Sequence, residues 1–159
     1  MVALPESWQL NGKIAVQTAQ DSGSATILWI ENHDRYNVSL YGPLGTQGLK
    51  LTGQPGHVTL ITADGKRFIA ESAEQLLAEN WGFHLPLSNL RYWIRGLPVP
   101  GIPHDSRFDN QHRLIFLNQQ GWRVEFQDYV ATKTIDLPHR LLINSATLKT
   151  KIVIYQWKI

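Results

Sequence analysis

Short segments in which apolar and polar residues alternate dominate the first seventy positions of the chain. They are rich in β-branched and aromatic residues and are separated by Gly, Asn, Asp or Pro, as consecutive antiparallel strands are. Asp64-Gly65 is a strong hairpin-turn pair ahead of the last segment. The pattern predicts a meander of about six strands, at 13–17, 25–30, 36–41, 49–52, 58–61 and 67–70.

The period then changes to that of two amphipathic helices. Ser72 with Gln75 has the spacing of a capping box, and Gly82 is expected to end the first helix. The second helix is expected to start near Pro86, to carry Leu90, Trp93, Ile94 and Leu97 on one face, and to end at Gly96 and Pro98.

Residues 98–109 look like a loop, and alternation then returns at 114–117, 122–126, 141–143 and 151–157. An antiparallel sheet of about ten strands rarely stays flat. We therefore expect an α+β fold, in which the sheet curls into a barrel or half-barrel around the two helices. Such a sheet encloses apolar volume, which is either filled core or a ligand cavity.

Composition narrows the class of protein. The 159 residues suit one domain, which we place at 1–159, and 43% apolar with 18% charged residues is typical of a globular chain. The net charge is +2 and the cations are scattered, so nucleic-acid binding is not expected. The chain has no cysteine, hence no disulfide and no thiolate chemistry.

Catalytic and metal-binding motifs are weak. His104, Asp105, Asp109 and His112 could bind a divalent metal, but a solvated turn is the favoured reading. No Gly-x-Ser-x-Gly elbow marks a nucleophile, and the glycines at 42, 45 and 48 precede a predicted strand rather than the helix that a phosphate loop requires. We expect no catalytic residue, no metal and no cofactor.

Several strings together point to a family. They are Trp29 with Asp34-Arg35-Tyr36, Gly42-Pro43-Leu44-Gly45, Gln54-Pro55-Gly56, Leu85-Pro86-Leu87, Trp93-Ile94-Arg95-Gly96-Leu97-Pro98, Gln120-Gly121-Trp122, Leu137-Pro138 and Trp157. From about Trp8 to Trp157 the chain resembles the LolB family of outer-membrane lipoprotein receptors. The resemblance implies a half-open antiparallel barrel of about ten to eleven strands, with helices as a lid over a hydrophobic cavity.

The resemblance also implies a function. A LolB-like protein accepts acylated lipoproteins from a periplasmic LolA-like carrier and inserts them into the inner leaflet of the outer membrane, without nucleotide hydrolysis. We expect a monomer at the periplasmic face of that membrane, with the carrier, acyl chains and phospholipid bilayer as partners. Family members are anchored through an N-terminal acylated cysteine. The chain as given has neither that cysteine nor a signal peptide and is expected to be soluble, and we favour a native protein that carries the anchor over an unanchored relative.

Two sets of candidate site residues follow. Leu44 lies at a predicted hairpin tip, and the resemblance implies that the loop of Gly42, Pro43, Leu44 and Gly45 inserts into the membrane; from composition alone, Leu44 could equally plug the barrel end. The candidates for an acyl-binding lining are Ile27, Trp29, Val38, Leu40, Leu49, Leu51, Leu77, Leu90, Trp93, Ile94, Val124 and Phe126. For any one of them, ordinary core packing is the commoner role.

Three other functions stay open at this point. A soluble carrier of the LolA type would share the cavity and lack the membrane-touching leucine. A periplasmic lipid hydrolase would use a histidine with Ser24 or Ser88. A structural envelope domain would have a filled barrel.

Overall fold

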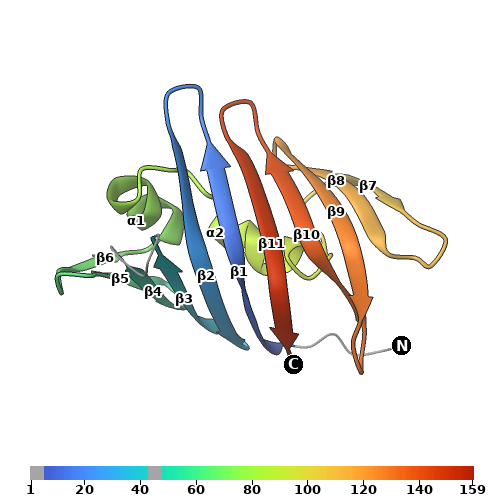
Figure 1. Ribbon diagram of the computed structural model, residues 1–159, viewed down its shortest axis with the longest axis horizontal. Helices are drawn as coiled ribbons and strands as arrows, with labels where there is room; N and C mark the ends of the chain where they lie inside the picture. The colour runs from blue at the N-terminus through green and yellow to red at the C-terminus, as the bar shows by residue number, and fades with distance from the viewer. Residues whose placement is uncertain (1–5, 43–47) are drawn as a thin grey trace. The chain divides into compact units, whose positions relative to one another are not determined.

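The computed structural model describes residues 6–42 and 48–159, and it contains an open antiparallel sheet with two short helices. The strands are β1 (Ser7–Gln17), β2 (Ser22–Asn32), β3 (Arg35–Tyr41), β4 (Leu49–Gln54), β5 (His57–Thr62), β6 (Arg67–Ala70), β7 (His104–Phe108), β8 (Leu114–Gln119), β9 (Trp122–Ala131), β10 (Asp136–Asn144) and β11 (Lys149–Lys158). The helices are α1 (Ala73–Asn80) and α2 (Leu87–Trp93). Figure 1 shows each element in chain order by colour.

The eleven strands form one sheet in the order β6-β5-β4-β3-β2-β1-β11-β10-β9-β8-β7. The predicted fold class, an antiparallel sheet of ten to eleven strands with two helices, is therefore confirmed. The chain divides into two compact units. The prediction of one domain over 1–159 stays a prediction. Within the described residues, no helix is both long and apolar enough to cross a membrane.

The first unit comprises Pro5–Ile14, Ser24–Pro86 and Ile154–Ile159. Its strands β2 to β6 pair consecutively, so cross-strand neighbours such as Trp29 and Val38 lie on one face of the sheet. Helix α1 packs against β5 and β6, as its position beside them in Figure 1 illustrates. Its core includes an aromatic cluster in which Trp8 contacts both Trp29 and Trp157, with ring centroids 5.5 and 5.4 Å apart.

Helix α1 begins as predicted, because the Ser72 side chain accepts a hydrogen bond from the Gln75 backbone N–H. The reciprocal half of the predicted capping box is wrong. The Gln75 side chain donates instead to Glu79, one turn further on, and the Ser72 hydroxyl donates to Glu74. Both side-chain donors thus bond a nearby carboxylate, which is a strong hydrogen-bond acceptor.

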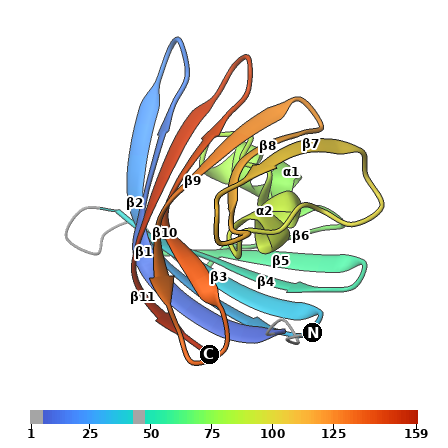
Figure 2. The same ribbon diagram turned by 90° about the vertical axis from the view of Figure 1, so that its right-hand side faces the viewer.

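The second unit contains Ala15–Gly23 and Leu87–Val153, and therefore α2 and strands β7 to β10. Helix α2 lies beside β7 and β8 in Figure 2. It ends in a Schellman arrangement, in which Leu97 N–H donates to Tyr92 O and Gly96 N–H donates to Trp93 O. Gly96 has a φ of 79° there, so the predicted stop at Gly96 has the left-handed backbone that favours glycine.

Several strand boundaries predicted from the sequence are wrong: β9 ends five positions later and β10 begins five positions earlier than expected, and the largest differences are at β7 and β1. Strand β7 lies inside the segment expected to be a loop. Its side chains are mostly exposed and polar, so they give no alternation from which a strand could be predicted. Strand β1 begins at Ser7, six positions before the predicted start, and its buried positions continue through Gly12. Asn11-Gly12 interrupts the apolar pattern without interrupting the strand.

Candidate functional site

The predicted membrane-insertion loop joins β3 to β4. Pro43, Leu44 and Gly45 lie outside the described residues, and Gly42 follows directly after β3. On the described side, a Cβ on Gly48 would come within 3.2 Å of the exposed Tyr41 ring, so glycine lets that ring lie against the backbone where β4 approaches. Leu40 pairs with Leu49 just inside the loop, which fixes the register of the two strands that carry it.

The predicted acyl-lining residues of the first unit share one face of the sheet. Ile27 lies opposite Leu40, Trp29 opposite Val38, and Val38 opposite Leu51. All of these residues are buried, and so is Leu77 of α1, whereas Leu49 is half-buried. The alternation in the sequence therefore identified the inward face of three strands.

The remaining candidates belong to the second unit. Val124 and Phe126 of β9 pair with Ile143 and Leu141 of β10, again on one face. Leu90 and Trp93 of α2 and Ile94, which follows the helix directly, are fully buried. Burial this complete is what core packing produces, and it leaves the acyl-binding role of each residue a prediction. That the two sets jointly line one cavity also stays a prediction.

A buried glutamine that the sequence analysis did not select organises the second unit. The side-chain oxygen of Gln119, at the end of β8, accepts hydrogen bonds from Trp93 Nε1 and Val99 N–H, both at 2.9 Å. Its amide group donates to the carbonyls of Val99 and Ile102, at 2.9 and 3.0 Å. One side chain thus fixes the end of α2 and the segment that follows it. Its place at the end of an alternating strand gave no signal of this role.

A second polar residue, Glu31, lies on the inward face of β2 in the first unit. It is 5% exposed, and its carboxylate accepts a hydrogen bond from Trp29 Nε1 at 3.1 Å. The bond satisfies the indole N–H of a fully buried tryptophan, and it places a polar group on a face of the sheet that is otherwise apolar.

The Trp-Ile-Arg-Gly-Leu-Pro motif lies against β9, where the Trp93 ring centroid is 6.4 Å from that of Trp122 and Gly96 faces Tyr129. A Cβ on Gly96 would lie 2.7 Å from the hydroxyl oxygen of Tyr129. That hydroxyl donates to Leu114 O at 2.5 Å, and the Arg113 guanidinium lies over the ring. Burial raises the pKa of Tyr129 well above its usual value, so the phenol stays a neutral donor.

Of the four residues considered for a metal site, Asp109 takes part in a turn, which is the role that the sequence favours over metal binding. Its carboxylate accepts hydrogen bonds from the backbone N–H groups of Gln111 and Arg113 and from Arg113 Nε. The bonds from Arg113 hold the pKa of Asp109 below its usual range. Over residues 6–42 and 48–159, no three His, Asp or Glu side chains gather as metal ligands would.

The residues considered for hydrolysis have the following surroundings. Ser24 of β2 and Ser88 of α2 are exposed. The hydrogen bonds of His33, His57 and His139 join them to Glu6, Thr59 and Leu137 O respectively. None of these three bonds is the serine–histidine contact that activates a hydroxyl nucleophile.

The hairpin ends of the second unit enclose a hollow of about 420 Å³. It is lined by Gln17, Thr18, Ala19 and Gln20 from one hairpin and by Ser145, Ala146, Thr147, Leu148 and Lys149 from the other. The Thr18 and Ser145 hydroxyls are engaged by the backbone of their own turns. We therefore assign this hollow no ligand.

Comparison with known proteins gives a consistent picture. The family model "Outer membrane lipoprotein LolB" matches residues 6–157. A protein of Ectopseudomonas mendocina named outer-membrane lipoprotein LolB is 44% identical over 153 residues, which are 96% of this chain and 75% of that protein. The protein of the same name from Pseudomonas fluorescens is 40% identical over 152 residues, with 96% and 74% covered.

Solved structures share the fold at low sequence identity. A LolA superfamily protein from Nitrosomonas europaea has a TM-score of 0.64 at 8% identity, over 99% of this chain and 88% of that one. A putative outer-membrane lipoprotein-sorting protein domain from Vibrio parahaemolyticus has a TM-score of 0.63, also at 8% identity, over 96% and 84%. At this identity the likeness concerns the fold alone.

Proposed function

The chain belongs to the outer-membrane lipoprotein LolB family, and on that premise we propose that it is a receptor for acylated lipoproteins. It accepts them from a LolA-like carrier and inserts them into the inner leaflet of the outer membrane. The observation that carries this proposal is the 44% identity to a LolB protein over 96% of the chain.

The energetics of acyl chains suit a binding and transfer role without catalysis. Each buried methylene is worth about 0.8 kcal/mol, so a lipoprotein cannot cross an aqueous compartment with its acyl chains exposed. Transfer can then run downhill, from a carrier that holds the chains less tightly to a receptor that holds them more tightly and on to the bilayer. The inward apolar residues of β2 to β4, β9 and the two helices are the part of the chain that we assign to the acyl groups.

Membrane delivery is assigned to the segment of Gly42, Pro43, Leu44 and Gly45. Burying one leucine gains about 1.5 to 3 kcal/mol, which is enough for a brief contact with a bilayer and too little for a permanent anchor. The register of β3 and β4 supports this assignment, because both strands are paired up to Leu40 and Leu49 and leave a short connection that carries one large apolar side chain.

A transfer assay with Leu44→Glu tests the proposal. Purified protein is given an acylated lipoprotein on its carrier, then liposomes, and both acceptance and delivery are measured. We expect the wild type to accept and deliver, and the variant to accept normally but deliver at least tenfold less, because a carboxylate does not enter the hydrocarbon layer.

Leu44→Met is the matched control and should deliver normally. A Leu44→Glu protein that loses several kcal/mol of stability would place Leu44 in the core and contradict its membrane role. A wild type that accepts lipoprotein but never delivers it would be a carrier of the LolA type. Failure to displace a fluorescent acyl probe would reject the receptor function altogether.

A further inference from the structure

The second unit presents a basic surface on the outward side of its sheet. We call it the outer cation rows, and cross-strand pairing defines it. The first row is Lys149, Asn144, Arg123, Asn118 and Asp105, running from β11 to β7. The second row, two residues along each strand, is Lys151, Leu142, Glu125, Phe116 and Arg107.

The cations of these rows are available to a partner. Arg107, Arg123, Lys149 and Lys151 are all exposed, and within residues 6–42 and 48–159 none of the four forms an ion pair. Four cations stand against two carboxylates, Asp105 and Glu125. The next cation along the sheet, Arg140, forms an ion pair with Asp128 at 3.5 Å and is therefore not one of the available cations.

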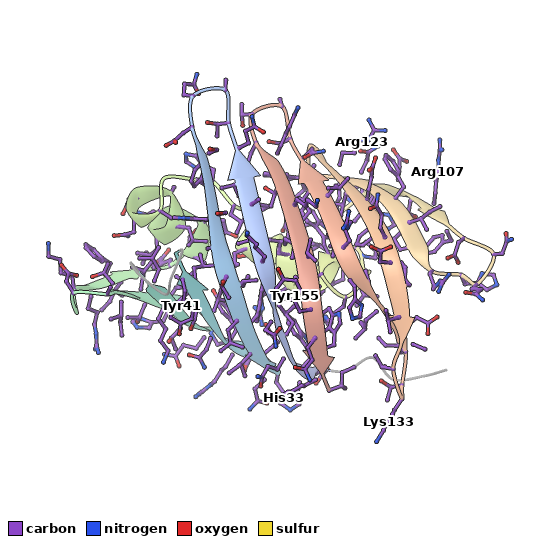
Figure 3. All side chains as sticks on the ribbon, viewed as in Figure 1. His33, Tyr41, Arg107, Arg123, Lys133 and Tyr155 are labelled. Carbon is purple, nitrogen blue, oxygen red and sulfur yellow. The ribbon has the colours of Figure 1, made fainter. Side chains whose placement is uncertain are left out.

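Phe116 organises the two arginines. The guanidinium carbon of Arg107 lies 5.8 Å from the centroid of its ring, and that of Arg123 lies 5.0 Å away. Figure 3 shows Arg107 of β7 and Arg123 of β9 reaching outward from the sheet, and Phe116 lies on β8 between these two strands. Cation–π contacts of this kind restrict the two side chains, so less conformational freedom is lost when their planar forks meet an anion.

We propose that the outer cation rows bind the phosphate headgroups of an anionic bilayer, as a membrane contact separate from the segment 42–45. Guanidinium groups bind phosphate oxygens through two parallel hydrogen bonds. The cations within a row lie about 10 Å or more apart, because neighbouring strands are about 4.8 Å apart and at least one strand separates them. Spacing of this kind suits a surface of repeated headgroups.

An acidic protein is the less suitable partner. Protein interfaces depend on a packed centre with aromatic anchors. Here the residues between the cations include Asn118, Asn144 and Glu125, and Phe116 is the single aromatic of the two rows. A bilayer needs no such centre, since each cation near an anionic surface strengthens binding by about fivefold on its own.

Vesicle flotation tests the inference on the purified chain, without lipoprotein or carrier. Vesicles of phosphatidylcholine alone are compared with vesicles that also contain phosphatidylglycerol, at about 0.15 M salt and at higher salt. The wild type should bind the anionic vesicles at least tenfold better, and salt should abolish the difference. R107Q combined with R123Q should lose at least tenfold of that binding, while its urea midpoint stays unchanged because both side chains are exposed.

The matched control, K66Q with K133Q, removes the same charge from exposed turns outside the rows and should bind as the wild type does. R107K with R123K keeps both charges but loses the planar forks, so its binding should lie between that of the wild type and that of R107Q with R123Q. Equal binding to both kinds of vesicle, or an equal loss in the control, would overturn the inference. So would binding to soluble poly-glutamate without binding to vesicles, which would indicate a protein partner. Because the assay contains no lipoprotein, its failure leaves the receptor proposal intact, and a failed transfer assay leaves this one intact.

Discussion

At the scale of single residues, Gly96 is constrained in two ways, by its backbone angle and by the lack of space for a Cβ on its Cα. Its φ of 79° closes the end of α2, and the space where a side chain would begin is occupied by the Tyr129 hydroxyl at 2.7 Å. The tyrosine has little freedom to move, because its hydroxyl bonds Leu114 O and Arg113 covers its ring. The sequence predicts the helix stop, but the phenol arrives from 33 positions away and leaves no local signal.

Gly96→Ala should therefore be more destabilising than backbone strain alone. Gly101 is the matched control, with a φ of 78° and no atom within 4 Å of the point where a Cβ would lie. We expect Gly101→Ala to cost about 1 to 2 kcal/mol in the free energy of unfolding, and Gly96→Ala about 1 to 3 kcal/mol more, measured by urea denaturation. Adding Tyr129→Phe should recover part of the second loss. Equal losses at the two glycines would mean that Tyr129 yields freely.

At the scale of elements, strands with one apolar face were predictable and strands without one were not. The faces of β2, β3, β4 and β9 follow from period-two alternation, and all their candidate lining residues except Leu49 are buried, but the burial of Glu31 and Ser39 was not expected. Strand β7 has no buried residue, so hydrophobicity could not reveal it, and its structure depends on pairing with β8. The turn between these two strands is organised by Asp109 and Arg113.

This turn should make stability depend on pH. The hydrogen bonds from Arg113 lower the pKa of folded Asp109 from 3.8, so the unfolded chain takes up its proton first as the pH falls. The stabilisation that ionised Asp109 contributes is fully present above the pKa of Asp109 in the unfolded chain. It is lost as the pH falls through the lower pKa of Asp109 in the folded protein. Urea midpoints measured between about pH 5 and 2 should fall less steeply for Asp109→Asn than for the wild type. Identical slopes for Asp109→Asn and the wild type would contradict this role.

At the scale of the whole molecule, residue order predicted the class of fold and the inward residues, but not which of them touch a ligand. Core packing and acyl binding both require apolar side chains at alternating positions, so one sequence signal serves both. Gln119 shows the converse, because a polar residue at a strand end holds α2 through bonds to partners 17 to 26 positions away.

Two leucines of β4 allow core packing and acyl binding to be tested separately. Leu51 is fully buried, and Leu51→Ala should cost about 2 to 5 kcal/mol in the free energy of unfolding. Leu49 is half-buried beside the segment proposed for membrane insertion, and Leu49→Ala should cost less than half as much while weakening fluorescent acyl-probe binding severalfold. The measurements are urea denaturation and probe titration. Unchanged probe affinity in Leu49→Ala would remove Leu49 from the proposed lining.

The sheet order has a consequence for how the chain folds. Every neighbouring pair of strands is consecutive in sequence apart from β1 and β11. Consecutive pairs close short loops and can form early, whereas β1 must wait for a partner more than a hundred residues downstream. As the chain folds, β1 therefore keeps one side unpaired until β11 is available to pair with it. That interval is when a chain of this topology is most open to a chaperone or to mispairing with a neighbouring copy.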